Sequence, residues 1–286
     1  MPSIDVRGGQ LSFEIFGDGN RETLILLHAA GCSGHQWRAI AGRLEHQFRI
    51  VIPNLRGYGG SSAWKSGDTP RLSMEADGVH DLVDALGRRA HLAGHGYGAA
   101  VALRAGLDAP QRYAGVTAIE PVSFHLLRKG LESDHNIFLT VAQLAIDMAS
   151  LAMTGNTARG VERFVEYFGG PGTWAQISLE VRRRMCDRVF SIACNVCALA
   201  QDKAVLDDYA DYQLPVHLVT GDRTVAPVRR VAERLRSYLP GARQDWLLNA
   251  GHMSATSTHA EAVAEMIASQ PGAYLMPPPS REIAAA

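Results

Sequence analysis

One glycine-rich segment of the sequence has a spacing that could support chemistry: GHGYGA, residues 94–99. It leads from an apolar run that predicts a strand, through a tight turn that needs small residues, into an alanine-rich run that predicts a helix. Two interpretations fit. In the first, Gly94, Gly96 and Ala99 form the G-x-G-x-x-A fingerprint of dinucleotide binding, and Glu120 ends the next predicted strand. In the second, the segment is a strand-turn-helix elbow, G-x-S-x-G, in which Gly96 replaces the nucleophilic serine.

The elements that must position this turn are short apolar runs bounded by Gly, Pro and Asn, which alternate with amphipathic stretches of helical length. The runs LILLH, RIVIP, AHLAG, VTAIE and HLVTG barely alternate in polarity, which indicates strands covered on both faces, as in a parallel sheet. We therefore expect an α/β fold with a mostly parallel, eight-stranded sheet flanked by helices. The expected strands are Ile4–Val6, Leu11–Phe16, Leu24–His28, Arg49–Ile52, Ala90–Ala93, Val116–Ile119, Val216–Thr220 and Gln244–Leu248.

The rhythm changes between Val122 and Asp211, where helical patterns follow one another with no strand run between them. The β pattern resumes at Leu214, so this segment predicts a helical cap inserted into a single sheet domain. We expect a core domain from residues 1–122 and 209–270, a cap from residues 123–208, and a flexible proline-rich tail from residues 271–286. The expected cap helices are Ile137–Met153, Val161–Phe168, Ala175–Val189 and Ser191–Gln201.

Motifs on either side of the turn decide between its two interpretations. HAAG (residues 28–31) follows one predicted strand, NLRGYGGS (54–61) follows the next, and AGHM (250–253) lies just past the last. Together and in this order they resemble the α/β-hydrolase superfamily, with its esterases, C–C hydrolases and dehalogenase-like members. The resemblance covers nearly the whole chain outside the cap and the tail. The dinucleotide interpretation is weaker, because that fingerprint normally follows the first strand of its domain.

The resemblance implies a role for each motif. Gly96 would occupy the position of the nucleophile, so the attacking hydroxyl or carboxylate is missing while the turn is preserved or relaxed. His252 would be the catalytic base on a loop above the sheet. The backbone N–H groups of Ala30 and Tyr97 would form the oxyanion hole, where side-chain identity matters little. The remaining histidines stay unassigned, and His28 and His95 are expected to make structural hydrogen bonds near this hole.

The acid that orients the imidazole has two candidate positions. The usual pattern after the seventh strand would place it at Thr224, so Asp222, at a spacer position, is the alternative acid. Glu120 ends the sixth predicted strand, where some dehalogenase-like members carry the acid, and we favour it. Asn54 replaces the family's usual Asp in the loop before Arg56, a softer departure outside the triad.

Three functions remain open for such a chain. The first is a hydrolase of a small apolar ester, lactone or C–C bond next to a carbonyl, whose original Ser or Asp nucleophile was removed by design or lost naturally. The second is a lyase or cofactor-free oxygenase in which His252, oriented by Glu120, acts as a general base. The third is a catalytically silent protein that binds a small molecule. We favour the first, although fold analogy alone does not fix function.

Composition excludes several classes of partner. The 28 Lys+Arg and 29 Asp+Glu residues give a net charge of -1, which provides no field for steering nucleic acid. The longest apolar helical stretch, Ile137 to Met153, is interrupted by Gln143 and Asp147, so we expect no membrane span. The N-terminus lacks the charged and apolar regions of a secretory signal, and a cytoplasmic location is the default expectation. The sequence does not predict an oligomeric state.

The cysteines predict neither a disulfide framework nor a metal site. Cys194 and Cys197 form C-x-x-C, but no second ligand pair follows. Cys32 lies beside the expected oxyanion loop without an activating base, so it is a poor substitute nucleophile. We expect no cofactor. The Phe, Met, Leu and Ile content of the cap predicts an apolar or aromatic, carbonyl-containing substrate or ligand.

Overall fold

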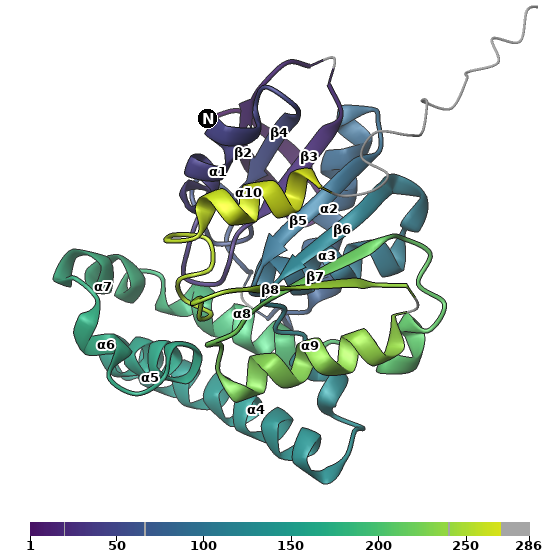
Figure 1. Ribbon diagram of the computed structural model, residues 1–286. Helices are drawn as coiled ribbons and strands as arrows, with labels where there is room; N and C mark the ends of the chain where they lie inside the picture. The colour runs from purple at the N-terminus through teal and green to yellow at the C-terminus, as the bar shows by residue number, and fades with distance from the viewer. Residues whose placement is uncertain (20, 66, 240, 270–286) are drawn as a thin grey trace, which may run out of the picture.

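The computed structural model of the chain describes residues 1–19, 21–65, 67–239 and 241–269, and the predicted tail, residues 271–286, lies outside them. All eight predicted strands are present within three residues of their expected bounds. They form one sheet in the order β1-β2-β4-β3-β5-β6-β7-β8 (Figure 1). The strands are β1 (Ser3–Val6), β2 (Gly9–Phe16), β3 (Thr23–Leu27), β4 (Arg49–Pro53), β5 (Ala90–His95), β6 (Tyr113–Ile119), β7 (Val216–Gly221) and β8 (Arg243–Leu247).

The sheet is parallel except at one edge, where β1 pairs with β2 and β2 with β4 in antiparallel register. In the centre, Leu27 of β3 pairs with Gly94 of β5, and His95 of β5 pairs with Ile119 of β6. The carboxyl ends of β3, β5 and β6 therefore lie next to one another. Whatever follows these three strands meets at one edge of the sheet, which is where open α/β sheets place their sites.

Successive residues of a strand point to opposite faces of the sheet, and both faces are covered by helices. Leu24 and Leu26 of β3 pack in one hydrophobic cluster, and Ile25 and Leu27 pack in the other. The first cluster lies under α1 (Arg38–Leu44) and α10 (Ala260–Ala268), and the second under α2 (Leu72–Leu86), α3 (Tyr97–Asp108) and α9 (Ala226–Tyr238). Figure 1 shows α1 and α10 in front of the sheet, with α2 and α3 behind it.

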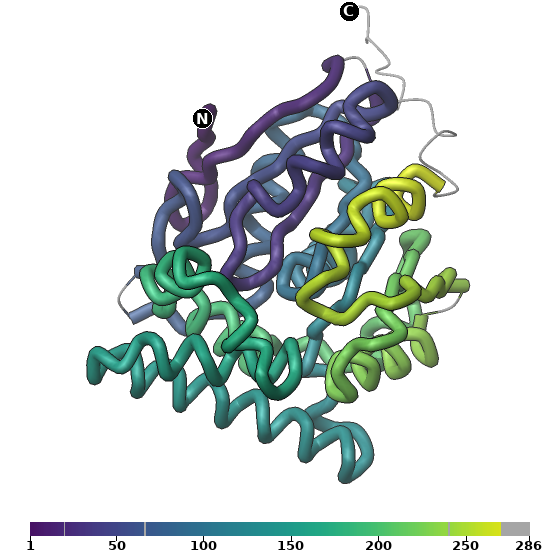
Figure 2. Tube along the Cα trace, turned by 60° about the vertical axis from the view of Figure 1, so that its left-hand side comes forward, coloured from purple at the N-terminus to yellow at the C-terminus, as the bar shows by residue number. Residues whose placement is uncertain are grey.

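Five α-helices lie between β6 and β7, and we call them the cap. They gather at one end of the sheet in both views (Figures 1 and 2). They are α4 (Glu132–Met153), α5 (Thr157–Gly169), α6 (Thr173–Gln176), α7 (Leu179–Cys186) and α8 (Val189–Gln201). The prediction of one continuous helix over Ala175–Val189 is wrong. The helix is interrupted at Ile177, and a new helix, α7, starts after Ser178. The Ser178 hydroxyl accepts a hydrogen bond from the Val181 N–H, as serine commonly does at the N-cap of a helix.

Helix α4 is longer than expected and begins at Glu132. We expected Gln143 and Asp147 to exclude a membrane span. By length and composition alone, however, α4 is apolar enough to cross a membrane. In this fold Val141, Leu144 and Met148 are buried against the rest of the cap.

Candidate active site

Gly96 stands at the turn between β5 and α3 with φ +56° and ψ −112°, a conformation that L side chains rarely adopt. The glycines on either side are required by sterics. A Cβ on Gly94 would lie 2.3 Å from the backbone of Gly98, and a Cβ on Gly98 would lie 2.1 Å from the carbonyl oxygen of Leu27. The turn therefore depends on Gly94 and Gly98 for close packing, whereas Gly96 fills a position that faces outward from the turn.

The imidazole of His252 lies directly against Gly96. A Cβ on Gly96 would stand 3.2 Å from Cε1 and 3.3 Å from Nε2 of His252. Two hydrogen bonds fix the loop that carries this histidine: the Ser254 hydroxyl accepts from the Gly251 N–H at 3.0 Å, and Nε2 of His95 donates to the His252 carbonyl at 3.0 Å. The structure thus brings together two residues that are far apart in the sequence.

Glu120 lies behind His252, on the side away from Gly96. Its Oε2 is 3.2 Å from Nδ1 of His252 and also accepts from the Thr224 hydroxyl, while its Oε1 accepts from the Gly221 N–H at 2.6 Å. Burial alone would raise the pKa of this carboxyl, but the hydrogen bonds from His252, Thr224 and Gly221 outweigh burial and hold the pKa below its ordinary 4.5. An ionised carboxylate at Nδ1 keeps the proton there and leaves the Nε2 lone pair facing Gly96.

Glu120 also has a backbone conformation that favours glycine, with φ +52°. The side chain that carries the carboxylate therefore extends from a residue with a strained backbone, directly after β6. Asp222, the alternative acid, is exposed. Its backbone N–H donates to the Leu247 carbonyl, and its backbone carbonyl accepts from the Arg229 guanidinium. Of the two acids considered from the sequence, only Glu120 contacts His252.

The turn after β3 spans residues 29–32, closed by a hydrogen bond of 3.1 Å from the Cys32 N–H to the Ala29 carbonyl. The Ala29 N–H donates to Gln36 Oε1 at 3.0 Å, and the Gly31 N–H donates to the Tyr58 hydroxyl at 3.0 Å. The N–H between them, that of Ala30, has no acceptor in the part of the chain that is described, and neither has that of Tyr97 at the first position of α3. Unpartnered N–H groups of this kind can meet a developing negative charge.

His28 and His95 make structural hydrogen bonds beside this turn, as the sequence predicted. His28 Nε2 accepts from the Leu55 N–H at 3.0 Å, and burial lowers the His28 pKa to about 4. Burial, with a smaller contribution from neighbouring His252, lowers the His95 pKa to about 3. His95 Nδ1 accepts from Gln36 Nε2 at 2.8 Å. Both rings are therefore neutral and hold loops in place.

Several residues at the site were not predicted. The Phe168 ring of α5 lies over His252 with centroids 5.1 Å apart, and Met185 and Ile192 lie close to Gly31. Phe168 belongs to a predicted cap helix, but an amphipathic pattern does not show which apolar residue faces a distant histidine. Their positions mean that cap side chains border the space above Gly96.

Glu75 of α2 was also not predicted. It is buried, accepts from the Arg56 N–H at 3.3 Å and from the Tyr97 hydroxyl at 3.4 Å, and burial raises its pKa to about 7. No pattern in the sequence distinguishes it from a surface carboxylate of α2.

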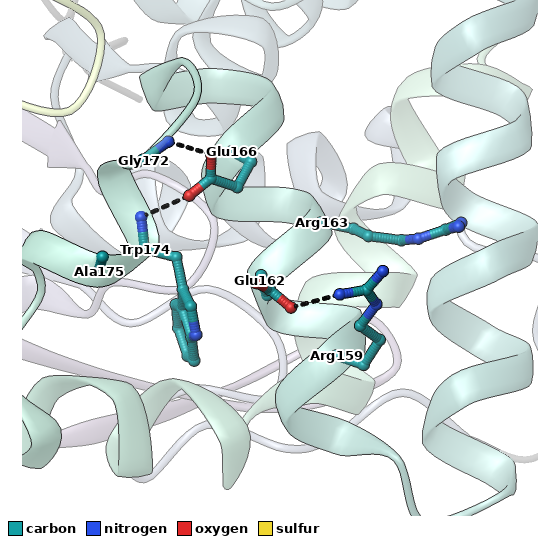
Figure 3. A pocket seen from close by; sticks show the side chains of 7 residues that line it. All are labelled: Arg159, Glu162, Arg163, Glu166, Gly172, Trp174 and Ala175. Carbon is teal, nitrogen blue, oxygen red and sulfur yellow. Dashed lines mark hydrogen bonds and ion pairs between the residues drawn. The ribbon is translucent and has the colours of Figure 1, made fainter.

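Two pockets of the described residues lie away from His252. One of about 390 Å³ is in the cap beside α5 and α6 (Figure 3). Its charged groups are already engaged: Glu166 accepts from the N–H groups of Gly172 and Trp174, and Arg159 pairs with Glu162. The other, of about 530 Å³, is an apolar groove between α4 and α8.

All four cysteines are free thiols. Burial raises the pKa of the Cys32 thiol to about 11, so it holds its proton at neutral pH. Cys194 and Cys197 are free thiols on α8. Among the described residues no group of three or more His, Cys, Asp and Glu could hold a metal ion.

Comparison with known proteins agrees with this architecture. Residues 24–266 match the Alpha/beta hydrolase family, and the chain belongs to it. A pimeloyl-[acyl-carrier protein] methyl ester esterase of Aliivibrio salmonicida is 27% identical over 227 residues, which are 78% of this chain and 77% of that protein. The dihydrolipoyllysine-residue acetyltransferase component of the acetoin cleaving system of Cupriavidus necator is 34% identical over 107 residues, 37% of this chain and only 28% of that protein.

Among solved structures, the enol-lactonase of Burkholderia xenovorans LB400 superposes with a TM-score of 0.74 at 19% identity, covering 93% of this chain and 98% of the lactonase. At this identity the likeness establishes the fold and leaves the reaction to be argued from the site.

Proposed function

We propose that the chain carries the site of a hydrolase for a small apolar ester, lactone or C–C bond next to a carbonyl, with Gly96 at the nucleophile position. The observation that carries this proposal is the line of three residues in which Glu120 orients His252 and His252 Nε2 faces Gly96. This is the order of acid, base and attacking group in a catalytic triad, with the attacking group missing. The ester and lactone chemistry named for the two similar proteins agrees with this assignment.

The oxyanion donors are the N–H groups of Ala30 and Tyr97, which stand at the ends of β3 and β5. They bind the carbonyl oxygen of the substrate and stabilise the charge that develops on it. Phe168, Met185 and Ile192 border the space beside His252 and Gly31, so the part of the substrate that fills this space is apolar or aromatic. None of these steps calls for a metal or cofactor.

A second candidate is supported by the intact pair of His252 and Glu120. With no side chain at Gly96, a water molecule at that position gives a proton to His252 Nε2 as its oxygen attacks the carbonyl carbon. The tetrahedral intermediate collapses, and the leaving oxygen or carbon takes the proton back from His252. This general-base route forms no covalent bond to the enzyme and relies on a positioned imidazole, worth about 10²–10⁴-fold in rate.

The variant Gly96→Ser tests the first candidate, with Gly96→Ala as its control because both add the same Cβ against His252. We expect Gly96→Ser to hydrolyse short p-nitrophenyl esters on the order of 10³-fold faster than Gly96→Ala, with a burst that marks an acyl-enzyme. The His252 ring must shift by a few tenths of an ångström in both variants, since the Cβ would lie 3.2–3.3 Å from it.

The same assay separates the candidates. If the chain with Gly96 hydrolyses the esters and both substitutions abolish that activity, the general-base route holds and the first candidate is wrong. If none of the three proteins turns over ester, lactone or C–C substrates, both candidates are wrong.

A further inference from the structure

The turn after β3 has a conformation that one peptide group decides. Gly31 is its third residue and has φ +78°, which is the type II arrangement. Types I and II differ by a rotation of the central peptide, here the one that joins Ala30 to Gly31, through about 180°. A hydrogen bond to the Gly31 N–H therefore selects one of the two states.

The Tyr58 hydroxyl makes that bond. It accepts from the Gly31 N–H at 3.0 Å and lies 2.6 Å from Oδ1 of Asn195. Because a phenol has a single proton and the Gly31 N–H supplies its own, the Tyr58 proton goes to Asn195. Both side chains are buried, at 1% and 0% exposure, so neither bond is exchanged for water at low cost.

Asn195 belongs to the cap, whereas Tyr58 and Gly31 belong to loops of the sheet domain. One helical turn earlier on α8, the Ser191 hydroxyl donates to the Gly57 carbonyl at 3.0 Å. Residues four apart lie on the same helix face, so α8 docks on the loop around Tyr58 through two hydrogen bonds from one face. The Tyr58 ring is further held edge-on against His28, with centroids 4.8 Å apart.

We propose that Tyr58 and Asn195 are positioning residues that couple the docking of α8 to the conformation of the oxyanion turn. With α8 in place, Asn195 fixes the Tyr58 hydroxyl, which fixes the central peptide beside Ala30. With α8 displaced, the hydroxyl loses its acceptor and the peptide is free to rotate. The docked cap thus holds in its type II form the turn whose residue Ala30 carries the proposed oxyanion donor. This inference rests on the proposed function only in taking the Ala30 N–H as an oxyanion donor.

Amide hydrogen exchange in the Gly96 chain tests the coupling without any turnover. We expect Tyr58→Phe and Asn195→Leu each to speed exchange of the peptide covering residues 29–34 by about fivefold to tenfold, the effect of one lost hydrogen bond. The control is Tyr113→Phe, which removes another buried phenol bond, 2.6 Å to His80, away from the turn. It should leave exchange at residues 29–34 unchanged.

Kinetics in the Gly96→Ser background add a readout that a merely structural role would not move. Tyr58→Phe and Asn195→Leu should lower kcat by about 10-fold to 100-fold with KM nearly constant, because the oxyanion forms only after the substrate has bound. Tyr113→Phe should leave both values unchanged.

The outcomes are distinguishable. Unchanged exchange in Tyr58→Phe overturns the role of Tyr58, and a response to Tyr58→Phe without one to Asn195→Leu overturns the link to the cap. Faster exchange in both, with an inactive Gly96→Ser chain, upholds the coupling and refutes the proposed hydrolytic function instead.

Discussion

Thr224 donates its hydroxyl to Oε2 of Glu120, the same oxygen that faces Nδ1 of His252. Thr224 stands at the position where the sequence pattern of the family would place the acid itself. Here the carboxylate belongs to Glu120, which follows β6, and the Thr224 side chain, which follows β7, donates a hydrogen bond to it. The Gly221 N–H occupies the other carboxylate oxygen at 2.6 Å, so both oxygens are held and the group is aimed at the imidazole.

Replacing this acid should disable the base. In the Gly96→Ser background we expect Glu120→Gln to lower kcat by about 10²–10⁴-fold, because a neutral amide neither enforces the His252 tautomer nor stabilises the imidazolium. Steady-state ester hydrolysis measures the effect. Asp222→Asn is the matched control, since Asp222 is exposed and does not contact His252, and it should leave kcat unchanged. If Asp222→Asn lowered kcat more than Glu120→Gln does, Asp222 would be the acid that orients His252.

Lowering the pH should destabilise the fold at pH values well above those at which carboxylates ordinarily titrate. Burial lowers the pKa of His28, His91 and His125 to about 4, and that of His95 to about 3, from 6.5. Below pH 6.5 the unfolded chain binds protons that the folded chain does not, so stability is fully present above 6.5 and falls as the pH drops toward 4. Each ring contributes up to about 1.4 kcal/mol per pH unit.

Urea unfolding between pH 7.5 and 5 measures this slope. His91→Gln should make the slope shallower by about one proton, whereas the exposed His46→Gln should not alter it. Equal slopes in all three proteins would show that His91 is protonated inside the fold.

The glycines that flank Gly96 should tolerate nothing larger. Gly98→Ala places a Cβ 2.1 Å from the Leu27 carbonyl oxygen, and both atoms belong to central elements that cannot move apart cheaply. We expect a loss of roughly 3 kcal/mol or more in the free energy of unfolding. Gly42→Ala in α1 meets no atom within 4 Å and should raise stability by about 0.5–1 kcal/mol. Thermal unfolding compares the two, and a stable Gly98→Ala protein would contradict the tight turn.

The cap should depend on one ion cluster at the start of α4. The Asp134 side chain is fully buried and accepts from the Arg230 and Arg234 guanidinium groups of α9. We expect Asp134→Asn to cost roughly 1–3 kcal/mol, less than the about 3–5 of a fully buried pair, because both arginines keep contact with water. Asp147→Asn, which breaks the more exposed pair with Arg163, should cost under about 1 kcal/mol. Urea unfolding measures both, and equal costs would refute the special role of Asp134.

The strands were predictable because burial on both faces leaves a direct trace in the sequence. Runs such as LILLH have no polar alternation, and they form the buried central strands. The prediction of one helix across Ala175–Val189 was wrong because Ser178 caps the start of a new helix. The spacing of apolar residues, on which that prediction rested, does not reveal such a cap. The domain boundaries at residues 122 and 209 stay predictions.

The site was predictable where it follows strand ends and unpredictable where it depends on distant packing. His252 and Glu120 were found because each follows a recognisable strand, and the structure places them 3.2 Å apart. The roles assigned to them, to Gly96 and to the two N–H donors stay proposals. Asn195 was invisible to the sequence argument, since its partner Tyr58 lies 137 residues away and nothing local pairs them.

Glycine at φ +56° has an evolutionary consequence. Any other residue at this point must hold a rare backbone conformation, at a cost of about 1–3 kcal/mol, so glycine stabilises the folded state relative to any residue with a reactive side chain here. Mutation toward Gly96 is downhill for the folded state, and the return is uphill. A lineage would acquire a nucleophilic side chain at this position only if turnover were selected strongly enough to offset that cost.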